Sequence, residues 1–356
     1  MPGPRVSVVV VTHNSREAIA RTLPALAGEL DSDDELIVVD NDSADGTPAA
    51  IRELVPGARI IETGANPGFA AACNAGAEAA GGDLLVLLNP DALPEPGFRD
   101  AIARPLGDGR VWAAWMGLVT EAGGRKVNTR GGVIHFTGIA WAGGAGEPLP
   151  EGGIPAAEVP FASGACLAVP LERWRAAGGM PEPFFLYQED VDLSLRLRLA
   201  GGTIGIEPAA RVDHDYEFSK GAAKWRYLER NRWAVILRTY PLALLLALAP
   251  ALVATEVAVF AIALAGGWGR QKVLAKLDLV RWLPRLLRER RAIQATRAIP
   301  AAEFARHLTP DLDSAYLGRA ARSRGLRAAL RAYWSVVLAL LGSTGDAASG
   351  SRGATG

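Results

Sequence analysis

The sequence predicts an α/β fold with a mainly parallel sheet, followed by a C-terminal helical region that associates with a membrane. Two observations predict the sheet: short apolar runs alternate with helix-like stretches from residue 6 to residue 88, and a polar loop follows each run. A third observation predicts the membrane region, because the 24 residues Leu242–Ala265 are nearly all apolar and long enough to reach across a bilayer core.

Four apolar runs predict the first strands, at residues 6–11, 35–39, 58–61 and 83–88. Helix-like stretches follow at residues 16–30 and 47–54, and an Ala-rich helix follows Gly68. Continuous apolar strands that alternate with helices are typical of a parallel sheet covered on both faces. The carboxyl ends of such strands meet at one edge, where ligands bind. We therefore expect the polar loops after these strands to converge on one cleft.

The pattern weakens further along the chain. Residues 112–160 contain Gly-rich, short strand-like pieces, whereas residues 161–169 predict a strand and residues 191–200 a helix. The predicted domains are a catalytic domain at 1–235, a helical membrane-associating region at 236–341 and a disordered tail at 342–356, which is rich in Gly, Ser and Ala.

Composition narrows the functional classes. The formal net charge is zero, but Lys220–Arg331 holds 21 Lys and Arg against 7 Asp and Glu, so this stretch carries +14 and the remainder −14. Such a split favours an anionic lipid surface as a partner, and no nucleic-acid motif accompanies it. Cys73 and Cys166 lie far apart without a CxxC pair, which excludes a cysteine metal site and a disulfide framework. The start of the chain lacks the pattern of a signal peptide, so we expect an intracellular protein.

Three polar segments have the residue types that chemistry at a sheet edge needs. Asn89-Pro-Asp91 places a carboxylate in a turn where a divalent cation and a diphosphate can meet, although a ligand-free turn has the same sequence. Asp40, Asp42 and Asp45 follow the second strand and suit ribose hydroxyls or a base edge. Helix capping is the alternative, which fits Asp45 better than Asp40.

The third segment is Gln188–Asp192, an acidic cluster at a helix start. The helix dipole favours carboxylates there, so the cluster can be a simple stabilising feature. A general base also needs an ionised carboxylate within reach of an acceptor hydroxyl, and a helix start helps to keep one ionised. Both interpretations stay open from the residues alone.

Five motifs together resemble those of family 2 glycosyltransferases with the GT-A (nucleotide-diphospho-sugar transferase) fold. They occur in the family's order and are similar to those of bacterial rhamnosyltransferase-like members. The motifs are Val8–Asn14, Val38–Thr47, Asn66–Asn74, Leu87–Asp91 and Phe185–Leu193.

The resemblance implies a role for each matching residue. Asp190 would be the catalytic base, with Glu189 supporting it. The nucleotide-sugar site would comprise Thr12, Asn14, Asp40, Asp42, Gly68, Asn74 and Asn89. Asp40 would serve the base or ribose, whereas Gly68 and Asn74 would shape the diphosphate side.

The resemblance also implies a divalent metal, Mg²⁺ or Mn²⁺. Asp91 matches the last aspartate of the family's DxD motif, and His214 resembles a histidine that completes metal coordination in related members. Asn89 stands where the motif has its first aspartate, which leaves fewer anionic ligands. Arg232 and Trp233 match part of the QxxRW motif of processive synthases, in which Glu229 replaces the glutamine, and are predicted acceptor or diphosphate contacts.

The function implied is an inverting transfer of a sugar, with rhamnose as the leading candidate, from a dTDP- or UDP-sugar to a lipid-linked glycan in cell-envelope polysaccharide synthesis. One alternative is a sugar nucleotidyltransferase, which would need a Gly-rich loop with Lys or Arg after the first strand; residues 12–17 lack it. Another is a non-catalytic membrane adaptor with a retained GT-A fold, which predicts loss of the acidic motifs.

The membrane region is expected to hold the enzyme to the cytoplasmic face of the cell membrane through Leu242–Ala265 and the basic helix that follows. Basic residues flank the apolar segment on both sides, so a single crossing conflicts with the positive-inside tendency. Pro250 is expected to break the segment into a shallow hairpin, and Pro284 to kink or split the basic helix. A single span and a buried hairpin in a soluble protein remain the alternatives.

Overall fold

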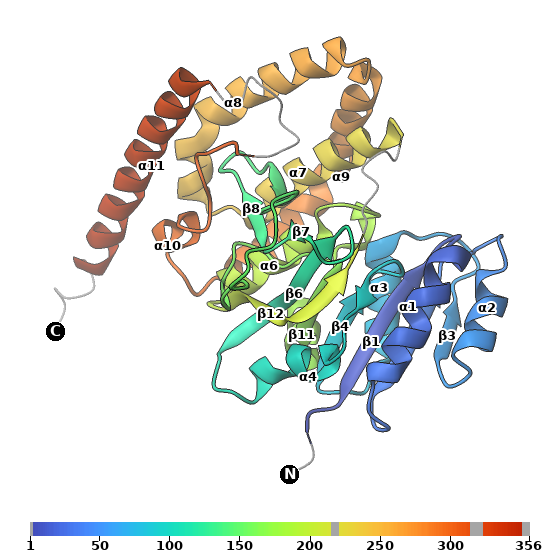
Figure 1. Cartoon of the computed structure of the whole chain (residues 1–356). Helices are drawn as coiled ribbons and strands as arrows, with labels where there is room; N and C mark the ends of the chain where they lie inside the picture. The colour runs from blue at the N-terminus through green and yellow to red at the C-terminus, as the bar shows by residue number, and fades with distance from the viewer. Residues whose placement is uncertain (1–2, 215–220, 314–322, 351–356) are drawn as a thin grey trace. The chain divides into compact units, whose positions relative to one another are not determined.

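The computed structural model describes residues 3–214, 221–313 and 323–350, and it divides the chain into two compact units (Figure 1). The first unit comprises residues 1–132, 142–197 and 202–218. The second comprises residues 133–141, 198–201 and 219–356.

The first unit is built on one ten-stranded sheet with the order β10-β12-β6-β11-β4-β1-β2-β3, in which β5 pairs with β12 and β7 with β6. Its strands are β1 (Val6–Thr12), β2 (Glu35–Asp40), β3 (Arg59–Glu62), β4 (Leu84–Leu88), β5 (Leu93–Pro94), β6 (Trp112–Glu121), β7 (Lys126–Thr129), β10 (Ala157–Glu158), β11 (Cys166–Pro170) and β12 (Thr203–Asp213). The short β8 (Gly132–Ile134) and β9 (Ala140–Ala142) form a separate two-stranded sheet.

The predicted parallel core of this sheet is confirmed. Strand β1 pairs in parallel with β2 and β4, and β2 pairs in parallel with β3. Thr12 lies opposite Asp40, and Asp40 lies opposite Glu62, so the carboxyl ends of these strands form one edge. Strand β11 is antiparallel to both β4 and β6, a feature that apolar periodicity does not reveal because antiparallel and parallel central strands are equally buried.

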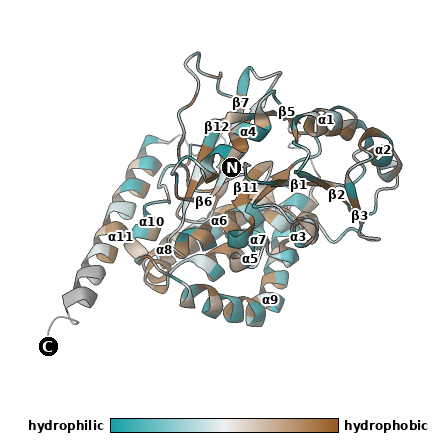
Figure 2. Cartoon of the chain, turned by 90° about the horizontal axis from the view of Figure 1, so that it is seen from below, coloured by the Kyte–Doolittle hydropathy of each residue, from teal (hydrophilic) through white to brown (hydrophobic). Residues whose placement is uncertain are grey.

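Helices cover both faces of this sheet, with α1 on one face and α3 on the other (Figures 1 and 2). The helices that include residues of this unit are α1 (Arg16–Glu29), α2 (Thr47–Leu54), α3 (Phe69–Ala79), α4 (Phe98–Ala103), α5 (Leu171–Ala177) and α6 (Glu189–Leu199), with single 3₁₀ turns η1 (Arg104–Leu106) and η2 (Glu182–Phe184). Buried apolar side chains of all the central strands make the core between these layers.

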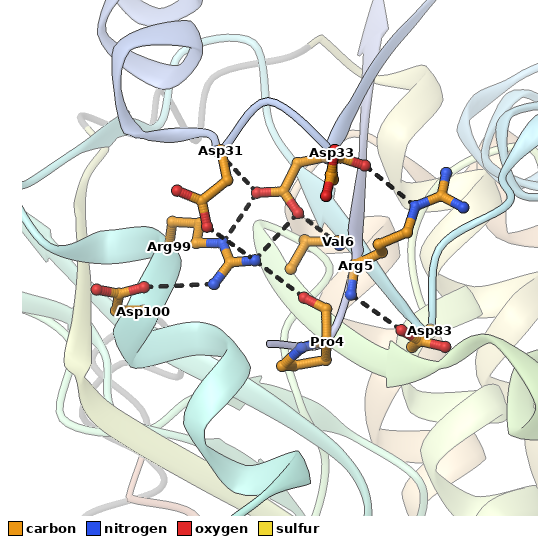
Figure 3. A network of polar contacts seen from close by, with 9 residues as sticks. Pro4, Arg5, Val6, Asp31, Asp33, Asp83, Arg99 and Asp100 are labelled. Carbon is orange, nitrogen blue, oxygen red and sulfur yellow. Dashed lines mark hydrogen bonds and ion pairs between the residues drawn. The ribbon is translucent and has the colours of Figure 1, made fainter. Parts of the chain in front are cut away.

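A polar network holds the amino end of β1, at the edge opposite the predicted cleft (Figure 3). The Arg99 guanidinium donates to both oxygens of Asp34, at 2.9 and 3.2 Å, and to the Pro4 carbonyl at 2.9 Å. Asp34 in turn accepts from the Val6 backbone at 2.8 Å, and its side chain is fully buried. Arg99 on α4 therefore joins the loop before β2 to the first residues of β1.

We expect Arg99→Met to lower the free energy of unfolding by about 3 kcal/mol, because it leaves the buried Asp34 carboxylate without its cation. Burial raises the pKa of Asp34, but bonds from Arg99 and two backbone amides outweigh it and the net shift is downward. The stabilisation is therefore present at neutral pH and is lost as the pH falls below about 4. Urea denaturation at pH 7 and pH 3 measures both effects, with the half-exposed Arg104→Met as the control. Equal losses in the two variants would contradict the assignment.

The second unit is mostly helical. Its helices are α7 (Ala223–Thr239), α8 (Leu242–Ala265), α9 (Gly269–Ala295), α10 (Ala301–Ala305) and α11 (Arg324–Gly350). Helices α7 and α9 lie side by side and run in the same direction, because Arg226 bonds Asp278 at 2.7 Å while Arg290 donates to the Tyr240 carbonyl at 2.7 Å. Helix α8 returns between their ends in the opposite direction.

One buried ionic cluster joins α7, α8 and α9. Glu256, the only charged residue of α8, accepts from Arg232 and from the Trp233 indole at 3.2 and 2.8 Å. Lys272 and Lys276 of α9 each lie 2.9 Å from its other oxygen. Burial opposes ionisation of Glu256, but the bonds from Lys276 and Lys272 prevail and lower its pKa to about 2. Ionised Glu256 therefore fixes the apolar helix α8 to its neighbours.

Some predictions about the C-terminal region need correction. Neither proline ends its helix: α8 continues through Pro250 and α9 through Pro284, since each proline removes only one backbone donor and the helices are held by neighbours on both sides of it. Helix α7 belongs to the second compact unit and packs with α9, while the domain boundary at residue 235 stays a prediction. Helix α11 continues to Gly350, beyond the predicted start of the tail, and residues 351–356 lie outside the described part.

Candidate active site

The loops after β1 and β2 are joined by a buried carboxylate. Asp40 accepts from the Thr12 hydroxyl at 2.8 Å, from the Ser43 hydroxyl at 2.6 Å and from the Ser43 backbone at 2.9 Å. Thr12 has no exposed surface and Asp40 is 2% exposed. Both residues thus order the floor of the predicted nucleotide pocket, and their polar atoms are already bonded to protein groups.

Asn14 and Asp42 are exposed in the same two loops. Asn14 has a φ of 50° and Asp42 a φ of 60°, left-handed conformations that Asn and Asp adopt more readily than most residues. The Asn14 carboxamide oxygen accepts from the Ala44 backbone at 2.9 Å, which links the two loops. Asp42 is exposed at the carboxyl edge, so its carboxylate is the one in this turn that is open to a ligand.

Asp45 lies between two helix starts. Its carboxylate accepts from the backbone of Arg16, the first residue of α1, and from the backbone of Thr47, the first residue of α2, each at 3.0 Å. The capping alternative is therefore correct for Asp45, whose carboxylate stabilises both helices.

Gly68 connects this pocket to the acidic helix start. A Cβ atom at Gly68 would lie 2.6 Å from the carbonyl oxygen and 2.7 Å from the Cα of Phe185, and its φ is +94°. The Phe185 carbonyl accepts from the Phe69 backbone at 2.7 Å, and the Asn41 side chain donates to the Gly68 carbonyl at 3.2 Å. Only glycine fits here, because the backbone four residues before Glu189 rests directly on it.

We expect Gly68→Ala to lower the free energy of unfolding by about 3 kcal/mol and to abolish measurable donor binding, since the added methyl displaces Phe185. Gly64→Ala is the matched control. Gly64 also has a left-handed φ, of +67°, but nothing lies within 4 Å of its added Cβ. It should cost about 1 kcal/mol and keep donor affinity. Urea denaturation and calorimetric donor titration of both variants test this, and intact donor binding by Gly68→Ala would contradict it.

Asn74, on α3, holds a loop that leads to the site. Its carboxamide donates to the Met180 carbonyl and accepts from the Met180 backbone, both at 2.9 Å. This pair of bonds holds the loop that leads to η2 and then to Phe185. Asn74 therefore positions the loop rather than presenting a free polar group.

The carboxylates of the acidic segment at the start of α6 differ in their exposure to solvent. Glu189 is 5% exposed, whereas Asp190 keeps a larger part of its surface accessible. One Asp190 oxygen accepts from the Gly164 backbone at 3.0 Å and the other from the Val191 backbone at 2.8 Å. Asp192 is fully buried and bonds Arg196 at 2.7 Å. Asp190 is thus the carboxylate of this cluster that a substrate can reach.

The environment also distinguishes the two neighbours electrostatically. Burial and the nearby Asp190 carboxylate raise the pKa of Glu189 to about 8, so Glu189 is protonated at neutral pH. Burial raises the pKa of Asp190 as well, while the backbone amides of Gly164 and Val191 oppose the shift by stabilising its ionised form. Asp190 is therefore the better placed of the two carboxyl groups to carry a negative charge, because backbone amides favour its ionised form.

The turn after β4 faces the end of β12. Asp91 has an exposed carboxylate, and one of its oxygens lies 3.0 Å from Nε2 of the buried His214. The Asn89 backbone donates to the Ala165 carbonyl at 3.0 Å, next to the Gly164 amide that holds Asp190. Residues 164–165 therefore support both the turn at Asn89–Asp91 and the carboxylate of Asp190.

Asp91 and His214 suit a divalent cation, since an ionised carboxylate and an imidazole are both ordinary ligands. Three or more His, Cys, Asp or Glu side chains do not gather into a metal cluster anywhere in residues 3–214, 221–313 and 323–350. A cation at these two side chains would need further oxygen ligands from elsewhere, and a diphosphate supplies them.

Arg232 and Trp233 belong to the second unit. The Arg232 guanidinium is 2% exposed and is bonded to Glu229, Glu256 and the Thr137 carbonyl. The Trp233 indole donates to Glu256. Glu229, which replaces the glutamine of the QxxRW motif, is the carboxylate that pairs with Arg232 and Lys272. These residues thus stabilise the helix cluster of their own unit.

Sequence reasoning missed two supporting residues. Asn41 is 2% exposed and holds Gly68, and Gly164 holds Asp190. The sequence does point to Asn41, because it lies between Asp40 and Asp42 in the polar loop after β2. Gly164 has none, since its function depends on a contact with a residue 26 positions away.

Comparison with known proteins now identifies the family. The model of the family described as "Glycosyl transferase family 2" matches residues 7–141. A Mycobacterium tuberculosis protein named N-acetylglucosaminyl-diphospho-decaprenol L-rhamnosyltransferase is 30% identical over 239 residues, which cover 60% of this chain and 77% of that protein. The chain belongs to glycosyl transferase family 2. It is rhamnosyltransferase-like, and it is a glycosyltransferase that uses a nucleotide-sugar donor.

Two further proteins are similar to this chain, one in sequence and one in fold. Pre-mycofactocin glycosyltransferase of Mycobacterium tuberculosis is 28% identical over 214 residues, which cover 59% of this chain and 43% of that protein. The solved structure of GalNAc-T7 with UDP, GalNAc and Mn²⁺ has a TM-score of 0.55 at 15% identity, covering 68% of this chain and 50% of that one. The predicted GT-A fold is confirmed.

Proposed function

We propose that this glycosyltransferase moves a sugar from a nucleoside diphosphate donor to a hydroxyl of a lipid-linked glycan, with inversion at the anomeric carbon. Rhamnose is the leading candidate for this sugar. One observation carries the proposal. The accessible carboxylate Asp190 and the turn of Asn89–Asp91 are both bonded to residues 164–165, so a base and a diphosphate site are fixed relative to each other.

The mechanism is a single displacement. Asp190 takes the proton of the acceptor hydroxyl, and the oxygen attacks the anomeric carbon as the bond to the diphosphate oxygen breaks. Glu189, whose pKa burial raises to about 8, would stay protonated and so add no second negative charge beside Asp190. Asp42 and Asn14 contact the nucleoside, while Asp40 and Thr12 hold their loops in place.

Asp91 and His214 would hold a divalent cation, Mg²⁺ or Mn²⁺, together with the donor diphosphate. The cation supplies neutralisation of the charge that develops on the leaving group. Asp91 is the carboxylate of this pair and contributes the anionic ligand, and His214 is fixed beside it by its burial at the end of β12.

The donor and acceptor follow from the relatives and the site. The mycobacterial relative's name specifies L-rhamnose transfer to N-acetylglucosaminyl-diphospho-decaprenol, so we propose dTDP-rhamnose as donor and a polyprenyl-diphosphate-linked sugar as acceptor, within cell-envelope polysaccharide synthesis. UDP-sugars are the second choice. The acidic motifs are all in place in the described site, which argues against a non-catalytic adaptor.

We further propose that the second unit docks on the cytoplasmic face of the membrane, with α8 lying in the plane of the surface. Helices α8 and α11 are both apolar and long enough to cross a bilayer, and only 17% of each apolar window is buried, which argues against a buried soluble hairpin. Helix α9 lies along α8 and carries many charges, so a crossing by α8 would bring several of them into hydrocarbon at about 3 kcal/mol each.

A donor screen tests the enzymatic proposal. Release of nucleoside diphosphate is measured with dTDP-rhamnose and with UDP- and GDP-sugars, with and without an N-acetylglucosaminyl-diphospho-lipid acceptor and with excess chelator. We expect acceptor-stimulated release from dTDP-rhamnose that the chelator stops, and a product anomer opposite to the donor anomer by proton NMR. Retention of configuration, or no release from any donor, would reject the proposal.

Cysteine labelling tests the topology. We expect Arg270→Cys, at the turn between α8 and α9, to react with a membrane-impermeant maleimide only after the cells are permeabilised. Labelling in intact cells would show that α8 crosses the bilayer, and recovery of the whole protein in the detergent-free soluble fraction would reject docking.

A further inference from the structure

The second unit presents apolar side chains to solvent along its long helices. Among the described residues, large apolar side chains are exposed only on α8, α9 and α11, apart from Leu106 and Val111. On α8 the exposed apolar side chains are Leu242, Leu246, Val253, Val257, Phe260, Ile262 and Leu264, and all of them except Ile262 recur every three, four or seven positions, along one face. Figure 2 shows the apolar colouring of α8 and the alternating colours of α9.

A hollow of about 430 Å³ lies at the start of this apolar face. It is lined by Leu242, Leu287, Arg290, Arg291, Gln294 and Arg297. Leu242 is the first residue of the apolar face of α8 and is 62% exposed, and Leu287 belongs to the exposed apolar side of α9. The hollow therefore joins three arginines to the end of a continuous apolar surface.

The three arginines of this hollow have no carboxylate within ion-pair distance in the part of the chain that the structure describes. Glu289, the nearest acidic residue in sequence, bonds Arg285 at 2.6 Å and Arg238 at 3.1 Å instead. Arg290 donates to the Leu237 and Tyr240 carbonyls, which fixes it at the rear of the hollow. Burial and the charge of Arg297 lower the pKa of Arg290, so the cluster holds like charges close together.

A second hollow that is lined by arginines differs from this one, because its arginines are paired with carboxylates. The hollow of about 530 Å³ on the first unit is lined by Arg104, Arg110 and Arg211 among others. There, Glu207 lies 2.6 Å from Arg110 and 3.9 Å from Arg104, and Glu95 lies 4.0 Å from Arg211. Its arginines are neutralised by the protein, whereas the exposed Arg291 and Arg297 beside Leu242 are available to an external anion.

We propose that the hollow formed by Leu242, Leu287, Arg290, Arg291, Gln294 and Arg297 binds the phosphate of an anionic membrane phospholipid, with its acyl chains along α8. Guanidinium groups bind phosphate oxygens through paired hydrogen bonds. Free phosphate would use the arginines alone, but a lipid phosphate also uses the adjoining leucines. A bilayer carries its phosphates at the boundary between polar and apolar layers, and the arginines occupy the same boundary on this unit.

This proposal rests on the membrane docking proposed above and adds a defined site to it. The test is flotation of the full chain with vesicles of phosphatidylcholine, of phosphatidylcholine with phosphatidylglycerol, and of phosphatidylcholine with polyprenyl phosphate at equal surface charge. The test variant is Arg291→Gln/Arg297→Gln, which leaves the carbonyl bonds of Arg290 intact. The control is Arg281→Gln/Arg285→Gln, which removes two charges from the same helix that already lie beside Asp278 and Glu289.

We expect the test variant to partition onto phosphatidylglycerol vesicles roughly 30-fold less than wild type, because each of the two lost charges contributes about fivefold to sixfold. The control should lose about threefold at most, because its charges are already paired. Equal losses in the two variants would overturn the site while leaving docking intact. A loss confined to polyprenyl phosphate vesicles would overturn the choice of phospholipid. Failure of wild type to float with any vesicle would reject docking itself, and the donor screen remains independent of all three outcomes.

Discussion

Asp190→Asn is expected to lower kcat by about a hundredfold to ten-thousandfold while donor affinity changes little. The substitution removes the ionised oxygen that takes the acceptor proton, but the side chain keeps its shape at the start of α6. The carboxamide oxygen of the asparagine can still accept a hydrogen bond from the backbone of Gly164 or Val191. Residues 164–165, which also support the Asn89–Asp91 turn, should therefore keep their positions. Single-turnover transfer and calorimetric donor titration give the two quantities separately.

Glu189→Gln is the matched control for that result. Glu189 is protonated at neutral pH, so a neutral carboxamide of the same size should lower kcat by about tenfold at most. Unfolding midpoints of both variants confirm that the comparison is between folded proteins. Near wild-type transfer by Asp190→Asn, or a greater loss in Glu189→Gln, would reject Asp190 as the base.

Asp91→Ala is expected to reduce turnover by about a thousandfold and to remove the dependence of donor binding on Mg²⁺ or Mn²⁺. Asp91 is exposed, and its oxygen lies 3.0 Å from His214, so its loss leaves one neutral ligand at the proposed metal site. Donor titrations over a range of metal concentrations measure the change. Because the Asp91 side chain is half-exposed, the free energy of unfolding should change by about 0.5 kcal/mol or less.

Asn89→Asp provides the opposite change in the same turn. It restores the first carboxylate of the DxD motif, so half-maximal activity should require less metal than in wild type. Full activity of the wild-type enzyme in excess chelator, or unaltered metal dependence in Asp91→Ala, would exclude a metal at Asp91 and His214.

The sequence by itself determined the local part of this structure. Strands β1, β2 and β4 were predictable because each is an apolar run followed by a polar loop, and burial on both faces requires that pattern, whereas the edge strand β3 is only partly buried, at Ile60 and Ile61. Helix α2 has the bounds predicted from the sequence, and α8 coincides with the predicted apolar segment but continues through Pro250, where a break was expected. Convergence of the loops at Thr12 and Asp40 followed from parallel pairing, since parallel strands end at the same edge.

Only the tertiary structure decided which polar atoms face a ligand. Asp40 and Asp42 are two positions apart and have the same side chain. The Asp40 carboxylate is hydrogen-bonded to Thr12 and Ser43, whereas Asp42 is exposed. Hydrogen-bond partners of this kind come from loops 28 residues apart, a relation that spacing along the chain does not encode. The difference between the buried Glu189, whose pKa is raised to about 8, and the more accessible Asp190 likewise depends on burial and on the Gly164 amide.

In the second unit, too, the sequence did not predict which charged side chains pair. The apolar stretch of α8 was evident from composition, but the function of its single carboxylate was not. Glu256 is stabilised by Arg232 of α7 and by Lys272 and Lys276 of α9, and this three-helix cluster gives Arg232 a structural partner inside its own unit. Charge pairing across helices depends on which faces pack together, so it is decided by the folded chain and not by the order of its residues.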